Sequence, residues 1–493
     1  MPSDAQKILF LIGSLSFVLA LYCQQIILGG VPHVSDETNY ILQARTLGSF
    51  QRVTEQQELG NLFALPFWFN WTSFSASGFP IGWPLLLSSG MAVGIGNLIN
   101  PLLCFLLPWL GWQFFTPYFK GDQKGLLLAC GLLALSPGVW LLGATWMAHT
   151  SCLSALFLLG IGLQNRSWRW AGGAGWAYIL LARPFDGVVL CGALFLLYVA
   201  KIRSIRWILS LLTLPTLALC IVLYDNWSLT GNPLVFPIDM WFSKFSEQSD
   251  KISSTCNQLG FGEDVGCIPT LGTFGHTLSK ALALAKMAFM RLDRLLMGTA
   301  GMSIILFIGI FWQRKYWRMI VFALWVPIAY LPYWSLGEAY GARFWHPMYL
   351  AIPIFIAVAL ARLPKFWPWV IFLGSISIGT IQMRKSLSQS YFCSDSMVPN
   401  KIAQIEEGFI FLDIRGSYEQ QWRWLYSPTK SCTPGTSIAA IYAMQTDKRH
   451  IRIWPKKQSA QQKYMQMIAE HPKYLLRYDL ASQKLAILPI TKQ

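Results

Sequence analysis

Charged side chains are scarce in this sequence. They make up 13% of its 493 residues, whereas an average soluble domain carries about 25%. Apolar runs of roughly 17–25 residues, the length that crosses a hydrocarbon core, recur along the chain. Ionisable groups are almost absent from the middle of these runs, where each costs about 3 kcal/mol. The scarcity excludes an ordinary soluble protein and disfavours an ion-coupled carrier, whose site lies at the bilayer midplane.

The basic excess, a formal charge of +16, does not indicate a nucleic-acid partner. Most Lys and Arg residues lie in short loops between apolar segments, where they set orientation. If the N-terminus is cytoplasmic, every short inside loop is basic. We therefore expect a multi-pass protein of the plasma (inner) membrane with loops 29–78, 224–285 and 336–345 outside. Eleven transmembrane helices are expected, at about 8–28, 98–115, 125–143, 147–164, 171–200 (two short spans), 207–223, 296–312, 319–335, 346–361 and 367–383.

The tail differs in kind from the rest of the chain. Residues 409–412, 438–442, 474–478 and 485–488 have the pattern of strands, and residues 459–470 that of a helix. The expected fold class is an α-helical polytopic membrane protein with a small C-terminal α/β domain. We place the transmembrane domain at residues 1–388 and the α/β domain at residues 389–493. Like the three outer loops, the α/β domain is expected on the extracytoplasmic side.

Metal-binding cysteine patterns are missing, since no Cys-x-x-Cys or Cys/His spacing occurs. Six of the ten cysteines lie in or beside apolar segments and are expected to be inert. Cys256, Cys267, Cys393 and Cys432 lie in polar regions instead. Their even number permits two disulfides, Cys256–Cys267 and Cys393–Cys432, if these regions face an oxidising compartment.

No glycine-rich nucleotide-binding loop is present, and a membrane-bound donor would need none. Nine ionisable residues, named at the end of this paragraph, map to the outer ends of spans or to the outer loops. The expected topology lets them converge on one cavity, which would suit a lipid-anchored substrate. Carboxylates and arginines together provide the functional groups needed for glycosyl transfer from a lipid phosphate. A carboxylate takes the acceptor's proton, worth about 10²–10⁴-fold, and arginine stabilises the leaving phosphate. The candidates are Asp36, Glu37, Arg45, His149, Arg183, Asp186, Glu338, Arg343 and His346.

Each candidate also has a plainer interpretation. Asp36 and Glu37 suit the N-terminus of a short interfacial helix, with Ser35 as its N-cap and Gly48 at its end. Arg45 and Arg183 suit interfacial anchors. Arg343 suits a partner for Glu338, while His149 and His346 suit satisfied helix-end histidines.

Four segments occur in a characteristic order: Asp36-Glu-Thr-Asn-Tyr with Ala44-Arg45, Phe79-Pro-Ile-Gly-Trp-Pro, Leu181-Ala-Arg-Pro, and Asn226-Trp-Ser-Leu-Thr-Gly-Asn-Pro. Together they resemble the motifs of the GT-C glycosyltransferases, in the branch of the protein O-mannosyltransferases and the lipid A aminoarabinose transferase. The resemblance covers roughly residues 8–390. The chain departs from it with isoleucine in the second motif, where the family has a proline pair, and with alanine before Arg183, where the family has threonine. The tail also differs from the sugar-binding fold of the eukaryotic mannosyltransferases.

The resemblance implies an inverting glycosyltransferase that moves a sugar from a polyprenyl-phosphate donor to an extracytoplasmic lipid, glycan or protein. It implies that Asp36 is the catalytic base and Glu37 its acidic neighbour. Arg45, Arg183 and Arg343 are candidates for the donor phosphate, with His149 and His346 beside them. No cofactor is required with certainty, although Asp36 and Glu37 are also candidates to hold a divalent metal cation. Two alternatives stay open: a polyprenyl-lipid flippase or carrier, and a catalytically inactive relative.

Overall fold

The computed structural model describes residues 2–55, 65–70, 73–246, 253–267, 273–297, 301–335, 340–364, 366–391, 402, 404–415, 449–453, 466, 471–479 and 484–490. The chain divides into two compact units. The first holds Met1–Cys23 and Pro80–Arg384, and the second holds Gln24–Phe79 and Lys385–Gln493. The first unit is helical, and the second contains one helix of the N-terminal region and two small sheets. The domain boundary expected at residue 388 stays a prediction.

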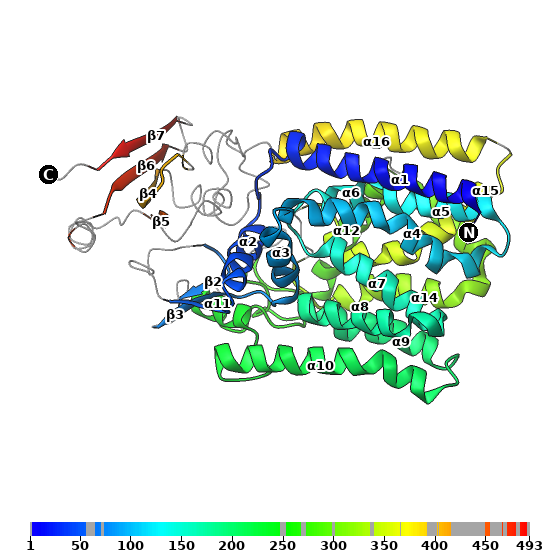
Figure 1. Ribbon diagram of the computed structural model, residues 1–493, viewed down its shortest axis with the longest axis horizontal. Helices are drawn as coiled ribbons and strands as arrows, with labels where there is room; N and C mark the ends of the chain where they lie inside the picture. The colour runs from blue at the N-terminus through cyan, green and yellow to red at the C-terminus, as the bar shows by residue number, and fades with distance from the viewer. Residues whose placement is uncertain are drawn as a thin grey trace. The chain divides into compact units, whose positions relative to one another are not determined.

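The first unit is a bundle whose long helices run roughly parallel to one another (Figure 1). Short 3₁₀ or π segments join or extend several of them: η1 (Cys23–Ile27), η3 (Gly96–Leu98), η4 (Arg166–Trp168), η5 (Asp186–Leu190), η6 (Arg314–Tyr316) and η7 (Arg343–Leu350). The helices are α1 (Ser3–Tyr22), α3 (Gly82–Ala92), α4 (Ile99–Phe119), α5 (Gln123–Leu135), α6 (Pro137–Gly143), α7 (His149–Gln164), α8 (Arg169–Ala182), α9 (Cys191–Val199), α10 (Ile205–Thr230), α11 (Pro237–Ser246), α12 (Leu278–Met297), α13 (Met302–Trp312), α14 (Trp317–Tyr330), α15 (Ile352–Ala361) and α16 (Trp367–Tyr391).

Among the described residues, three helical segments are long and apolar enough to cross a membrane alone: Ser3–Ile27, Gly96–Phe119 and Ile205–Thr230. Two bent pairs raise the number to five if each pair is one span. α5 and α6 meet at 44°, and η7 and α15 meet at 55°. Other expected spans coincide with shorter apolar helices, including α7 and α13. The count of eleven spans stays a prediction.

Glycines let α7 and α8 pack backbone to backbone. A Cβ on Gly162 would lie 2.7 Å from the Cα of Gly172, and one on Gly175 would lie 2.4 Å from the carbonyl oxygen of Ala155. Small residues allow this close approach in membrane helices. Because a short connection makes the two helices antiparallel neighbours, the start of α7 lies beside the end of α8. This contact positions the residues discussed below.

The N-terminal part of the second unit contains α2 (Ser35–Gly48) and a three-stranded antiparallel sheet. Its strands are β1 (Thr54–Glu55), β2 (Trp68–Asn70) and β3 (Phe74–Ser77), in the order β1-β3-β2. The side-chain amide of Asn39 donates to the Pro66 carbonyl at 2.8 Å, and Tyr40 packs on Phe79 with ring centroids 5.0 Å apart. The helix is therefore held by the loop residues that follow it.

The tail forms a four-stranded sheet of β4 (Gly408–Arg415), β5 (Arg449–Ile453), β6 (Lys473–Asp479) and β7 (Lys484–Pro489). Its order is β5-β4-β6-β7. β4 runs parallel to β5 and to β6, while β7 is antiparallel to β6. The strands expected at 409–412, 474–478 and 485–488 lie within β4, β6 and β7. The strand expected at 438–442 and nearly all of the helix expected at 459–470 fall outside the described residues, and β5 was not expected.

Candidate active site

Arg183 lies at the end of α8 because a proline follows it. Pro184 disfavours helical backbone at the preceding residue, and Arg183 has φ −145° and ψ 78°. Its N–H group still bonds to the Ile179 carbonyl at 2.7 Å. The chain then enters η5, a π-helix that begins at Asp186. Such π-helical turns often occur at functional sites.

The guanidinium of Arg183 has three protein partners. It bonds through Nε to Asp186 Oδ2 at 2.6 Å, through Nη1 to His149 Nε2 at 2.7 Å, and through Nη2 to the Tyr330 hydroxyl at 3.0 Å. The Tyr330 hydroxyl in turn donates to Asp186 Oδ1. The Arg183 side chain is only 15% exposed. Since a guanidinium has five N–H groups, two have no partner among the described residues.

His149 is left with a buried donor. Arginine cannot accept a hydrogen bond, so Nε2 of His149 must accept the bond from Arg183. The neutral ring then carries its hydrogen on Nδ1. Within the described part of the chain, this atom and Nε2 of His346 are buried without a hydrogen-bond partner. An unpaired buried polar group costs about 1–3 kcal/mol, so the Nδ1–H group of His149 points to a ligand that supplies an oxygen.

A small pocket adjoins these groups. Its polar wall consists of His149, Arg183, Asp186 and His346. The remaining wall is apolar and comes from Cys152, Leu153, Leu156, Ile179, Leu190, Cys191 and Pro347. The lining thus combines an ion pair and two imidazoles with apolar side chains.

Phe344 links the second arginine to this group. The centroid of its ring lies 5.4 Å from Cζ of Arg183 and 5.3 Å from Cζ of Arg343. The same ring stacks on Tyr330, with centroids 5.3 Å apart and planes at 4°. Guanidinium groups are attracted to aromatic rings at this range. We call His149, Arg183, Asp186, Tyr330 and Phe344 the Arg183 cluster.

Gly82 brings the second sequence motif against the third. A Cβ on Gly82 would lie 2.6 Å from both the Ala182 nitrogen and the Leu181 carbonyl carbon, so only glycine lets α3 approach the end of α8 this closely. One residue on, the Trp83 indole donates to the Trp146 carbonyl at 2.7 Å. The motif therefore packs beside Arg183 and holds the loop that precedes α7.

The fourth motif forms a helix end. Gly231 follows α10 with φ 76°, a left-handed conformation that glycine adopts readily. The Asn226 side chain donates to the Pro233 carbonyl at 3.0 Å, and the Thr230 hydroxyl donates to the Asn226 carbonyl at 2.8 Å. These contacts give Asn226, Thr230 and Gly231 a structural role in turning the chain after the helix.

Asp36, Glu37 and Arg45 lie on α2, in the second unit. Ser35 is the first residue of this helix rather than its N-cap, because Val34 occupies the cap position. The Glu37 side chain caps the start of the helix: its Oε2 accepts hydrogen bonds from the N–H groups of His33 at 2.8 Å and Val34 at 3.2 Å. Glu37 is 1% exposed, Asp36 is half-buried and Arg45 is exposed. Gly48 ends the helix, as expected.

The structure thus groups five of the expected candidates, His149, Arg183, Asp186, Arg343 and His346, in the first unit. Among them, Asp186 is the ion-pair partner of Arg183. Sequence reasoning missed Tyr330 and Phe344. A tyrosine at the end of an apolar run has the signature of a membrane-interface residue, so no local signal marked Tyr330. Glu338, Cys393 and Cys432 fall outside the described residues.

Within the described residues, no group of three or more His, Cys, Asp and Glu side chains is placed to hold a metal ion. The Glu37 carboxylate is already engaged with two backbone N–H groups. Metal binding by Asp36 and Glu37 stays a hypothesis.

No protein-family model matches the sequence, and no curated protein matches it at a significant level. Solved structures are similar in fold. ArnT from Cupriavidus metallidurans bound to undecaprenyl phosphate gives a TM-score of 0.56 at 12% identity, over 97% of this chain and 94% of that chain. The apo state of ArnT gives 0.52 at the same identity and coverage. The oligosaccharyltransferase of Archaeoglobus fulgidus with Zn and sulfate gives 0.49 at 12% identity, over 95% of this chain and 68% of that chain.

The fold resembles that of the GT-C membrane glycosyltransferases. The similarity to ArnT extends over nearly the whole of both chains. Together with the apolar helices, it identifies an integral membrane protein.

Proposed function

We propose that this protein is an inverting glycosyltransferase that moves a sugar from a polyprenyl-phosphate donor to an acceptor on the extracytoplasmic side of the membrane. The observation that carries the proposal is the Arg183 cluster, in a fold similar to ArnT. Its buried guanidinium lies beside a small pocket and beside histidine nitrogens that have no partner among the described residues. That relative was solved with undecaprenyl phosphate bound.

The donor phosphate would be held by the Arg183 cluster. The two N–H groups of Arg183 that have no partner among the described residues offer charge-assisted bonds to phosphate oxygens. His149 Nδ1–H offers a third, neutral donor. Asp186 and Tyr330 hold the guanidinium in place, so little side-chain entropy is lost when phosphate binds.

Asp36 is the proposed general base, and Glu37 is proposed to orient it. Glu37 closes the first turn of α2 and thereby sets the conformation of the residue before it. Asp36 is half-buried. Arg45 and Arg343 are retained as candidates for the donor phosphate. Arg45 is exposed at the last turn of the helix, and Arg343 begins η7.

The proposed reaction is a single displacement. Asp36 takes the proton of the acceptor hydroxyl while the hydroxyl oxygen forms a bond to the anomeric carbon. The bond from that carbon to the phosphate oxygen breaks, and its electron pair leaves with the polyprenyl phosphate. Attack from the face opposite the leaving group inverts the anomeric centre. Arg183 offsets the charge that grows on the phosphate.

The test is transfer by purified protein from a panel of polyprenyl-phosphate sugars. We expect Asp36→Asn to reduce transfer at least about 100-fold, because the amide cannot accept the proton. Binding of undecaprenyl phosphate should be retained. Glu55→Gln, the same charge change at an exposed residue of β1, is the matched control. Full activity of Asp36→Asn would refute the assignment of the base, and lipid binding with no transfer from any donor would favour a carrier or an inactive relative.

A further inference from the structure

A disulfide closes the loop between Cys256 and Cys267 in the first unit. The loop is tightened by a bond from the Gly266 N–H group to the Cys256 carbonyl at 2.8 Å. His276, which follows the loop in the sequence, pairs with Gly262 inside the loop through two backbone hydrogen bonds, at 2.9 and 2.8 Å. The His276 ring stacks on Phe261, with centroids 5.5 Å apart. The loop and His276 thus form one connected structure.

This structure contacts the segment that directly follows Tyr330. Nε2 of His276 donates to the Leu331 carbonyl at 2.9 Å. The N–H group of Gly260 donates to the Pro332 carbonyl at 2.9 Å. These two contacts engage the first two residues after α14 through their backbone oxygens. They therefore restrain the path of the chain as it leaves the helix.

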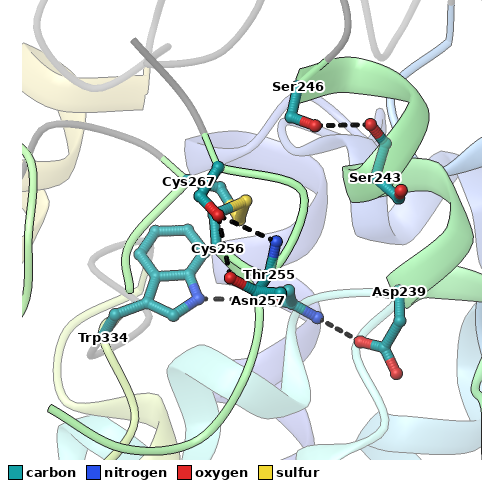
Figure 2. The surroundings of a disulfide bond; sticks show 9 residues. Asp239, Ser243, Ser246, Thr255, Cys256, Asn257, Cys267 and Trp334 are labelled. Atoms are coloured by element: carbon teal, nitrogen blue, oxygen red, sulfur yellow. Dashed lines mark hydrogen bonds between the residues drawn. A yellow bond between two sulfur atoms is a disulfide. The ribbon is translucent and has the colours of Figure 1, made fainter. Parts of the chain in front are cut away.

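Asn257 supplies the third contact. Its Oδ1 accepts a hydrogen bond from the Trp334 indole at 3.2 Å, and its amide donates to Asp239 Oδ1 at 2.6 Å. Figure 2 shows Asn257 lying between Asp239 of α11 and the indole of Trp334, beside the disulfide. The indole also packs edge-on against Phe242, with centroids 5.9 Å apart. Trp334 is 4% exposed, so this anchoring is buried.

We infer that Asn257 and the disulfide loop are positioning elements for the Arg183 cluster. The three contacts at Leu331, Pro332 and Trp334 set the C-terminal end of α14, and Tyr330 is its last residue. The position of Tyr330 decides whether its hydroxyl reaches both Arg183 and Asp186. The disulfide loop therefore acts on the anion site through the end of a helix. The consequence for phosphate binding depends on the function proposed above, whereas the effect on Tyr330 does not.

The experiment places 3-fluorotyrosine at position 330 of the full-length protein in detergent and records its ¹⁹F resonance. Asp186→Asn provides the reference shift for a disturbed Tyr330 hydrogen bond. We expect Asn257→Ala and the Cys256→Ser/Cys267→Ser double variant to move the resonance in the direction of that reference. Gln258→Ala, an exposed amide at the next position in the loop, is the matched control and should leave the resonance unchanged.

Binding of undecaprenyl phosphate is the second readout. Asn257→Ala should weaken it about 10-fold, the loss expected when a charged hydrogen-bond network is disturbed. An unchanged resonance in a folded Asn257→Ala variant would overturn the inference. If the double cysteine variant does not fold, Asn257→Ala alone decides. If the wild type does not bind undecaprenyl phosphate, the proposed function fails, and the ¹⁹F shift still tests the positioning role.

Discussion

At the scale of single residues, neighbours decide what each candidate does. Arg183 leaves the helix because Pro184 follows, and its guanidinium is then held by Asp186, Tyr330 and His149. Glu37 illustrates the opposite case. It has the charge expected of a catalytic acid, but its carboxylate is engaged with the backbone at the start of α2. Arg183 and Glu37 are both site candidates in the sequence, but the structure gives them different hydrogen-bond partners: side chains for Arg183 and backbone N–H groups for Glu37.

Arg183→Lys should impair ligand binding without removing the positive charge. Lysine has three donors on one atom and cannot bridge the three partners that the planar guanidinium reaches. We expect undecaprenyl phosphate binding to fall at least about 10-fold, and the free energy of unfolding to fall by about 1–3 kcal/mol because buried polar groups lose their partners. Isothermal titration and thermal unfolding measure these changes. Arg166→Lys, at an exposed arginine of η4, should alter neither, and wild-type binding by Arg183→Lys would contradict the role of the guanidinium.

Asp239 lies outside the candidate membrane spans, and its carboxyl group should make the stability of the protein depend on pH. Burial raises the pKa of its carboxyl above the usual 3.8, and the hydrogen bond from Asn257 offsets part of this rise. A raised pKa means that the unfolded chain ionises first, so stability is lost as the pH rises from 3.8 through the folded-state pKa. Asp239→Asn removes this loss. The Tm of the variant relative to wild type should therefore increase between pH 4 and pH 7, whereas exposed Glu263→Gln should show no such trend.

At the scale of secondary-structure elements, close packing of short helices builds the candidate site. Gly82 in α3 touches the backbone at the end of α8, and glycines of α7 and α8 bring those two helices together. Arg183, His149 and Tyr330 of the candidate site lie at helix ends, where regular helical hydrogen bonding stops. The second sequence motif is thus explained by packing, since none of its described residues lines the pocket.

Gly82→Ala should therefore destabilise the first unit. The added Cβ meets backbone atoms at 2.6 Å, which cannot rotate away as a flexible side chain would. We expect a loss of about 1–3 kcal/mol in the free energy of unfolding, the usual cost of overpacking. Gly192→Ala in α9 is the matched control, because a Cβ there meets no atom within 4 Å. Equal thermal stability of the two variants would show that α3 does not pack this tightly on α8.

At the scale of the whole molecule, the similarity to ArnT covers nearly the entire chain at only 12% identity. A similar fold at this identity is physically reasonable, because many apolar residues of suitable size fill a buried position about equally well. Orientation is set instead by loop charge, and the basic short loops predict a cytoplasmic N-terminus. The disulfide between Cys256 and Cys267 agrees with an oxidising environment for the loop at 224–285.

Orientation is testable with paired cysteine substitutions. In intact cells, a membrane-impermeant maleimide should label Gln258→Cys, which is exposed in the disulfide loop, and spare Arg166→Cys, which lies in a predicted inside loop. Non-reducing mass spectrometry of protein alkylated before extraction should find Cys256 linked to Cys267. The reverse labelling pattern, or free thiols at both native positions, would contradict the predicted topology.

The sequence by itself determined the class of protein. Its apolar runs require a membrane, its local signals mark the end of α2 at Gly48 and the break after Arg183, and its strand patterns recur in β4, β6 and β7. Such features follow from near neighbours and short periods. Only the tertiary structure decided the partners of Arg183. Tyr330 lies 147 residues away along the chain and His149 lies 34 away. A hydrogen bond over such a separation depends on how helices pack, and no local pattern encodes that.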